Sequence, residues 1–416
     1  MEKNLFAFRG HRNRGQIIMF PKGKRIPLIL AVIALFWFSI YTYSPIFTVY
    51  IHQFSSTQIA GTIIASYGFV QMCLRIPIGI LSDKIKNRKL FISIGLIASM
   101  ISALGLVLLP SSGFALVFRG LAGVTAATWV PFSILYSSYY DKEQATRAIG
   151  MANAFNFGGQ MVATLFGGYL ADWTGSYAPP FYLAAGAAAV GLILGFFLKE
   201  QEKEDFPDRP VRITELLSVA KEPMLLIASG LMILVQFCSF ATVYGFTPTF
   251  AKANVNATSS NLAVMTTLIT LPAIFAAPLS AKIAKKLGGF DKTMLIVYSI
   301  SVMYCIAVPF VRSLIVYYLL QLVYGFGRGM ATSLLMSAAI LKIDPSRRAT
   351  AMGFFQAIYG IGMTLGPQIV GLFGKSAAGE TNLPGLTVGF FFVAATQIAG
   401  AVLAMTLLRK HLSAEN

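Results

Sequence analysis

Long runs of apolar residues alternate with short polar breaks along most of the chain. A helix needs about 20 consecutive apolar residues to cross the hydrocarbon core of a bilayer. Twelve runs approach or exceed that length, at residues 27–49, 58–81, 90–109, 114–137, 147–170, 179–198, 224–248, 261–281, 293–311, 314–341, 349–373 and 385–408. A membrane β-barrel would show alternating segments of about ten residues instead. The pattern predicts an all-α membrane protein with twelve transmembrane helices.

The composition supports the same class of protein. Of 416 residues, 56% are hydrophobic and only 12% are charged, which is more apolar than a soluble domain tolerates. The first apolar run follows a basic segment, residues 1–26, but it is too long for a signal peptide and no small-residue cleavage site follows it. We therefore expect an uncleaved first span and a multi-pass protein of the cell membrane, with the lipid bilayer as its main partner.

The positive charge is distributed unevenly over the loops. If the N-terminus is cytoplasmic, 27 of the 33 Lys and Arg residues fall on the cytoplasmic side, and only Lys252, Arg312 and Lys375 lie in outer loops. Cytoplasmic loops of membrane proteins are enriched in Lys and Arg, so both termini are predicted to be cytoplasmic. The net charge of +17 is then an orientation signal, and we expect no nucleic-acid partner.

The longest polar interval, residues 199–223, divides six runs from six and predicts a cytoplasmic linker. An offset of 203 residues relates the two sides: it carries Tyr41 to Tyr244, Pro45 to Pro248, Gly150 to Gly353, Gly159 to Gly362 and Gly168 to Gly371. The chain thus divides into a six-helix half at 27–198, a second at 224–408 and a tail at 409–416. Parallel repeats place a solute site between the halves, near the midplane, with alternating access by rocking.

One loop carries a specific resemblance. Gly79-Ile80-Leu81-Ser82-Asp83-Lys84, followed by Arg88 and Lys89, resembles the motif between spans two and three of the major facilitator superfamily. Lys86 stands where that family usually has glycine, and Asn87 where it usually has a basic residue. The resemblance implies that Asp83 is a latch that contacts the opposite half and stabilises the outward-facing state. Gly79, Lys84 and Arg88 would belong to the same gating element, although the basic residues also serve as orientation signals.

Two further motifs resemble the same family. Arg119 and Gly123, in RGLAG, match an arginine that precedes a glycine by four residues, which implies a conformational role; a structural tether between helices is the alternative. A row of spaced glycines in span five is associated with antiporters, but Ala163-Thr164 replaces its Gly-Pro pair, whereas span eleven has Gly366-Pro367. This partial pattern leaves the direction of transport open.

Three ionisable residues lie within the predicted spans, and all are arginines: Arg75, Arg119 and Arg328. Such residues are costly in a membrane and are functional candidates by default. Arg328 lies roughly 20 Å along its helix, near the midplane, whereas the other two lie close enough to an interface to snorkel. No carboxylate falls well inside a span, so the usual carrier of protons for cation export is missing. An arginine without a carboxylate favours an anionic solute.

Polar residues recur at helical spacing in the paired spans five and eleven. Asn153 and Asn156 share one face of span five, and Gln356 and Tyr359 take equivalent places in span eleven. With Tyr41 of span one, they are candidates for the cavity lining. Hydrogen bonding between packed helices is the alternative for each of them.

Three functional classes are compatible with a multi-pass helical membrane protein. The first is a secondary transporter of a small anion, the second a broad-range drug or metabolite efflux antiporter, and the third a polytopic enzyme or receptor. No nucleotide-binding loop, nucleophile-base arrangement or metal-ligand spacing occurs in the loops, so we expect no catalytic residue, metal or cofactor. We expect a monomer that moves a small-molecule solute. The identity of the solute and the coupling ion stay open.

Overall fold

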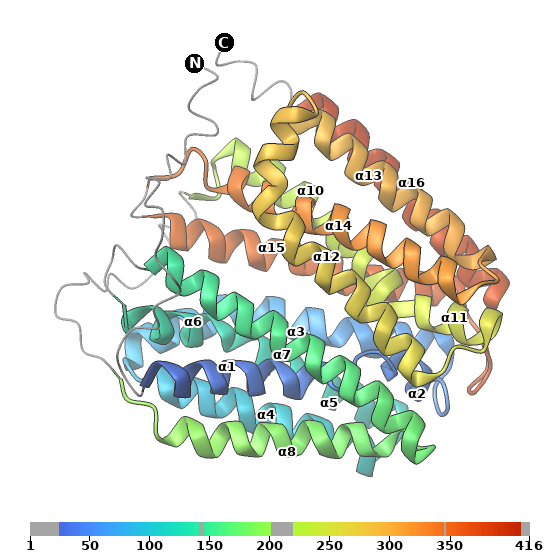
Figure 1. Ribbon diagram of the computed structural model, residues 1–416, viewed down its shortest axis with the longest axis horizontal. Coiled ribbons are helices and arrows are strands. Elements are labelled where there is room, and N and C mark those ends of the chain that lie inside the picture. The colour runs from blue at the N-terminus through green and yellow to red at the C-terminus, as the bar shows by residue number, and fades with distance from the viewer. Residues whose placement is uncertain (1–24, 141–144, 201–218, 345–346, 409–416) are drawn as a thin grey trace.

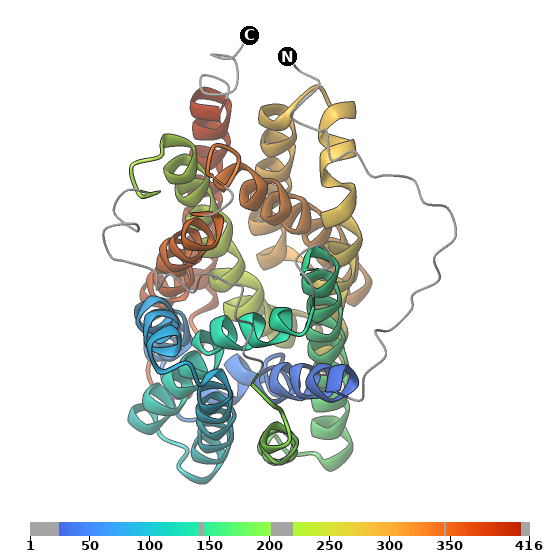
Figure 2. The same ribbon diagram turned by 90° about the vertical axis from the view of Figure 1, so that its left-hand side faces the viewer.

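The computed structural model describes residues 25–140, 145–200, 219–344 and 347–408. Almost all of them are helical, and in Figures 1 and 2 the helices of residues 25–200 gather in the lower part of the view while those of residues 219–408 form the upper part. The predicted basic segment, nearly all of the predicted linker and the tail lie outside the described residues. The boundaries of the two halves therefore stay predictions at those points.

The first half contains eight helical segments. They are α1 (Arg25–Tyr41), α2 (Phe47–Ile51), α3 (Thr57–Ile85), α4 (Arg88–Leu108), α5 (Ser112–Ala127), α6 (Trp129–Ser138), α7 (Ala145–Thr174) and α8 (Ala178–Phe196). Segments α1 and α2 together correspond to the first predicted span, and α5 and α6 to the fourth.

The second half repeats this order. Its helices are α10 (Pro223–Ala241), α11 (Thr247–Val255), α12 (Ser259–Lys286), α13 (Phe290–Ala307), α14 (Leu314–Ala339), α15 (Arg348–Phe373) and α16 (Leu383–Leu403). Adding 203 to the bounds of α3 gives 260–288, against 259–286 for α12, and adding it to those of α7 gives 348–377, against 348–373 for α15. The sequence repeat is thus matched by a repeat of helix boundaries.

The first predicted span is interrupted, whereas the sequence pattern suggested one run over residues 27–49. Helix α1 ends at Tyr41, and the chain passes through a turn before α2 begins at Phe47. Pro45 lies in this turn and lacks the N–H group that would bond to the carbonyl of Tyr41. At the repeat-equivalent place, Pro248 directly follows a π-helical segment, Thr242–Phe246, which joins α10 to α11. The regular α-helix is therefore interrupted near a proline at the same place in both copies, by a turn in the first and by a π-helical segment in the second.

Eight helical stretches of the described residues are long and apolar enough to cross a membrane by length and composition. Helix α1 is apolar but shorter, and α7, α14 and α15 are long but fall outside that group. The last three are the helices that carry Asn153, Arg328 and Gln356, so their polar residues and glycines explain their lower hydropathy. The count of twelve crossings stays a prediction.

Each half has its own buried core. One pair of clusters is built almost entirely from α1 to α8 around Phe36, Phe132 and Phe181, and another pair from α10 to α16 around Tyr298 and Phe390. The halves meet mainly through α3 against α15 and α7 against α12. Tyr67 and Phe240, from opposite halves, belong to the same cluster at the centre.

Glycines allow the closest helix contacts. A Cβ atom on Gly167 would lie 1.7 Å from the carbonyl oxygen of Thr42, and one on Gly366 would lie 2.4 Å from that of Phe237. The spaced glycines of α7 and α15 therefore seat these helices against α1 and α10, as small residues commonly do in membranes. Gly150 and Gly353 are different, because nothing lies within 4 Å of an added Cβ at either position.

Candidate functional site

Arg328 lies in the middle of α14. It is 14 residues from Leu314, the first residue of that helix, which corresponds to about 21 Å of helix. Its guanidinium carbon lies 5.6 Å from the centroid of the Tyr244 ring, in the range of a cation–π contact. The side chain is partly exposed, and its Nε atom is buried without a hydrogen-bond partner among the described residues. The structure thus places a charge at mid-depth with donor capacity to spare.

A row of aromatic rings leads from this arginine into the first half. The Tyr244 ring, which faces Arg328, lies 6.5 Å from the ring of Tyr41 on α1. Trp37 lies 6.1 Å from Tyr41, and Trp129 lies 5.4 Å from Trp37. The rings therefore connect Arg328 of the second half to α1 and α6 of the first.

The other predicted lining residues behave differently from one another. Tyr359 packs against core residues of both halves, and Gln356, one turn away, is half-buried. Asn156 is buried and accepts a hydrogen bond from Gln160 of its own helix, whereas Asn153 is exposed. The amide of Asn156 is thus engaged within α7, and Asn153 remains free to meet solvent or solute.

The remaining two span arginines are both buried. Arg119 of α5 lies against three aromatic rings: its guanidinium carbon is 4.6 Å from Phe47, 4.7 Å from Tyr67 and 5.8 Å from Tyr43. It does not snorkel, because this aromatic cage holds it inside the first half at 6% exposure. Arg75 is 5% exposed, and its Nε and Nη1 atoms have no hydrogen-bond partner among the described residues.

The predicted gating loop contains an ion pair and two helix caps. Arg88 and Asp83 approach to 3.8 Å, so this contact of Asp83 lies within its own half. Lys86 ends α3 with a left-handed backbone, φ 54° and ψ 22°, and Asn87 caps α4 by accepting a hydrogen bond from the N–H of Leu90. Lys84 is exposed. A Cβ atom added to Gly79 would lie 3.7 Å from Cγ1 of Val130, an ordinary van der Waals contact.

The helix ends predicted to be extracellular, called the outer ends below, are tied together across the halves. Asp172 at the end of α7 accepts hydrogen bonds from the N–H groups of Ser259 and Ser260, at 2.8 and 2.7 Å, where α12 begins. Ser376, after α15, accepts one from the N–H of Thr57, where α3 begins, at 3.2 Å. These two contacts lie at closely corresponding places of the repeat, since an offset of 203 carries Asp172 to Lys375, the neighbour of Ser376, and Thr57 to Ser260.

Contacts between the halves extend inward from these joints. A Cβ on Gly168 would touch Ser259 and Ala263, and one on Gly360 would touch Met72, near the middle of α3. The hydrogen bonds of Thr57 and Asp172 across the halves and the ring contacts of Tyr41 and Tyr67 lie at or outside this level. With the predicted orientation, these contacts close the molecule on its outer side.

Sequence reasoning missed three buried or interfacial residues. Gln71 and Gln236 are each 7% exposed, and their Oε1 atoms have no hydrogen-bond partner among the described residues. Gln71 precedes Arg75 by four residues, a spacing that could have drawn attention to it. Asp172 lies at the outer end of a predicted span and was not among the candidate site residues. No group of three or more His, Cys, Asp or Glu residues with metal-site geometry occurs within the described ranges.

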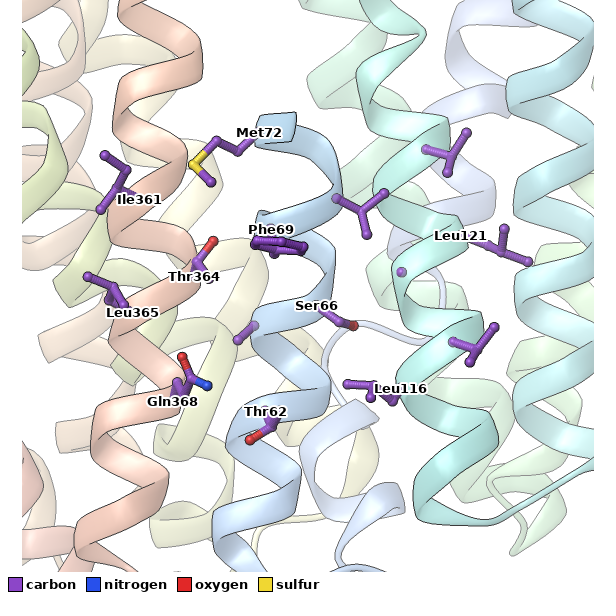
Figure 3. A pocket seen from close by; sticks show the side chains of 15 residues that line it. Thr62, Ser66, Phe69, Met72, Leu116, Leu121, Ile361, Thr364, Leu365 and Gln368 are labelled. Carbon is purple, nitrogen blue, oxygen red and sulfur yellow. The ribbon is translucent and has the colours of Figure 1, made fainter. Parts of the chain in front are cut away.

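A separate groove opens on the lipid-facing side between α3, α5 and α15, with a volume of about 770 Å³ (Figure 3). Phe69 and Leu116 line it, with Ser66 between them and Gln368 on the far side. None of the predicted site residues contributes to this groove. Its apolar lining is suited to contact with lipid chains, and the candidate solute site lies elsewhere, around Arg328.

Comparison with known proteins shows relatives over most of the chain. An uncharacterized MFS-type transporter of Bacillus subtilis, YceJ, is 25% identical over 381 residues, 89% of this chain and 95% of the relative. The multi-drug resistance efflux pump PmrA of Streptococcus pneumoniae is 25% identical over 73% of this chain and 75% of its own length. These similarities extend through both halves.

A solved structure has the same fold. The crystal structure of a bacterial homolog of the human lysosomal transporter Spinster, in an inward-facing and unoccupied conformation, matches with a TM-score of 0.78 and 16% identity, over 95% of this chain and 99% of the other. The sequence model of the Major Facilitator Superfamily matches residues 29–367 and, in a second match, residues 232–415. The overlapping second match agrees with the internal repeat. The chain belongs to the Major Facilitator Superfamily and is a membrane transporter.

Proposed function

We propose that this protein is a secondary transporter of a small organic or inorganic anion, working by alternating access in the cell membrane. The observation that carries the proposal is Arg328, held at mid-depth against Tyr244 with an unpartnered Nε atom. A guanidinium in a low-dielectric cavity attracts carboxylate or phosphate groups and donates paired hydrogen bonds to them.

The distribution of acidic residues supports the same charge preference. In the described part of the chain, acidic residues occur at helix ends and connections: Asp83, Asp172, Glu200, Glu222, Asp291, Asp344 and Glu380. No carboxylate from this part of the chain is therefore available at mid-depth to neutralise Arg328 or to bind a cation. The charge of the site is complemented by the solute.

Uptake of labelled anions into proteoliposomes tests this function. Arg328→Ala should raise the KM for the transported anion at least about tenfold, equivalent to 1.4 kcal/mol, because the charged donor is lost. Arg328→Lys should keep part of the uptake, since the charge remains while the paired hydrogen bonds do not. Arg312→Ala, which removes an exposed arginine bonded to Asn254, is the matched control and should leave KM unchanged. Equal uptake by the native protein and Arg328→Ala would refute the proposal.

The second candidate is broad-range efflux of amphipathic compounds. It is favoured by the row of aromatic rings that includes Trp37, Tyr41 and Trp129 and by the relative named as a multi-drug resistance efflux pump. Cells that express the protein would then tolerate unrelated amphipathic cations better than cells that lack it, and Arg328→Ala would leave that tolerance intact. The anion proposal predicts no such tolerance.

For the gating loop, we propose that Asp83 acts as a conformational latch during transport. It pairs with Arg88 at 3.8 Å. In the outward-facing state it would contact the second half, as the family motif implies. Gly79, Lys84 and Arg119 would act in the same transition through helix packing and charge.

A further inference from the structure

Two glutamines from opposite halves occupy matching places at the centre of the molecule. The rings of Tyr67 on α3 and Phe240 on α10 are stacked, with centroids 6.2 Å apart and planes 13° apart, so the two helices face each other at this level. Helix α3 runs inward from Tyr67 and α10 runs outward to Phe240. One turn inward from the ring pair, each helix therefore carries a glutamine on the same face: Gln71 and Gln236.

Gln71 lies at the depth of Arg328, and Gln236 lies near the middle of the helical stretch Pro223–Val255. Gln71 is 14 residues from Thr57, where α3 begins, just as Arg328 is 14 residues from the start of α14, and both spacings correspond to about 21 Å from the outer end. Ring contacts connect the glutamines to Arg328. Phe240, one turn from Gln236, lies 5.1 Å from Tyr244, and the Tyr244 ring faces Arg328. The glutamines and the arginine thus belong to one central region.

Neither glutamine is explained by helix packing. Amides in membrane helices commonly bond to a neighbouring helix, yet the Oε1 atoms of Gln71 and Gln236 have no hydrogen-bond partner within the described ranges, although each residue is only 7% exposed. An unsatisfied buried polar group costs on the order of 1–3 kcal/mol, so each amide is poised to gain from a bound polar group. Arg75, one turn further along α3, has two unpartnered nitrogen atoms on the same side of the helix.

We propose that Gln71 and Gln236 form a second polar subsite that binds hydroxyl groups of the anion whose charge is held by Arg328, an inference that rests on the proposed anion transport. A hydroxyl both donates and accepts hydrogen bonds, so it satisfies an amide in either orientation. The substrate class is a hydroxylated organic anion, such as a hydroxy acid or a sugar acid. A site built to bond a hydroxyl discriminates strongly against the analogue that lacks it.

Matched pairs of carboxylates test the subsite in the purified full-length protein. Succinate against malate, hexanoate against gluconate and 3-phenylpropionate against 3-phenyllactate each differ by hydroxyl groups alone, and their Kd values can be measured by equilibrium binding. For the pair that the native protein binds best, the hydroxylated member should bind about tenfold more tightly, because it satisfies the buried amides. This comparison needs no substitution and so does not depend on the folding of a variant.

Substitutions then assign the preference to the two glutamines. Gln71→Leu and Gln236→Leu should each reduce the Kd ratio of the pair severalfold, while the Kd of the member without hydroxyls changes less than about twofold. Gln368→Leu makes the same chemical change in the lipid-facing groove and should leave the ratio unaltered.

The outcomes separate the subsite from the proposed function. A native ratio near one, or a ratio unaffected by both substitutions, would overturn the subsite while anion transport stands. Equal weakening of both members of the pair would mean that the glutamines act through structure, which also overturns it. If the native protein binds none of the carboxylates, the subsite for a hydroxylated organic anion is overturned, and the uptake of labelled anions decides separately whether anion transport stands.

Discussion

At the scale of single residues, the two departures of the gating loop from its family motif have a physical explanation. Lys86 takes the left-handed backbone that ends α3, a conformation in which a side chain costs about 1 kcal/mol and glycine costs nothing. Asn87 replaces a basic residue but caps α4 through its side-chain oxygen. The family's glycine at the Lys86 position therefore reflects a helix end, and this chain keeps that geometry at some cost.

Lys86→Gly should accordingly raise the free energy of unfolding by about 1 kcal/mol, since the strain at φ 54° disappears. Thermal unfolding of the purified protein measures the change. Lys84→Gly is the matched control: it removes the same charge from the last turn of α3 and should destabilise the protein, because glycine is a poor helix former. If both variants change stability in the same direction, loss of charge and not backbone strain is responsible.

At the scale of helices, the outer ends are held by caps that cross between the halves. Asp172 accepts the first N–H groups of α12, where the positive end of the helix dipole also favours a carboxylate. Partial burial would raise the pKa of Asp172, but hydrogen bonds from Ser260, Thr258 and Ser259 outweigh it and lower that pKa from 3.8 to about 2. The corresponding joint, between Thr57 and Ser376, is uncharged. Asp172 is therefore the ionic part of the outer closure.

Asp172→Ala should shift the protein toward the outward-open state. Spin labels at Ser176→Cys and Lys252→Cys, in a Cys73→Ser background, would report longer distances between the outer ends of α7 and α11. Because the pKa is lowered on closure, the contact is fully favoured above pH 3.8 and is lost only as the pH falls toward 2. The native distances should thus be constant from pH 5 to 8. Glu380→Ala is the control, and an equal shift in that variant would contradict a specific latch.

At the scale of the whole molecule, the halves are joined at their outer ends and centre. Gly150 and Gly353, at equivalent places toward the inner ends of α7 and α15, have open space around them, in contrast to the tightly packed Gly167 and Gly366. Rocking of two rigid halves about the joined centre would separate their inner ends while the outer ends are closed. The same helices that close the outer side would then close the inner side in the alternate state.

An alternating-access transporter that is closed at its outer ends should admit reagents from the cytoplasmic side. Asn153→Cys, placed in a Cys73→Ser background, should react with a membrane-impermeant thiol reagent applied to that side, since Asn153 is exposed in the inner half of α7. Saturating solute should slow the reaction if Asn153 lines the solute pathway. Ala163→Cys, on a fully buried position of the same helix, should stay unlabelled. Labelling of Asn153→Cys from the outer side alone would contradict the predicted orientation.

The class of protein and its internal repeat can be read directly from the amino-acid sequence. Apolar runs long enough to cross a bilayer leave helices as the structure that satisfies every backbone hydrogen bond there, and the 203-residue offset appears in both the residue pattern and the helix bounds. The sequence also identified Arg328 as a candidate, because a charged residue within an apolar run is visible without any contact information. The break at Pro45 was missed, since hydropathy does not register a lost backbone donor.

Which polar residues contact one another became visible in the packing of the helices. Periodicity shows the face of a helix on which a side chain lies but not the helix that packs against that face. Asn156 and Gln71 are both amides in apolar helices. In the structure Asn156 accepts a hydrogen bond from Gln160, whereas the Oε1 atom of Gln71 has no hydrogen-bond partner among the described residues. Arg119 was likewise placed by sequence within reach of an interface, whereas three aromatic rings from neighbouring segments enclose it. Partners far apart in the chain depend on how helices pack, and that packing is set by close glycine contacts that no single segment contains.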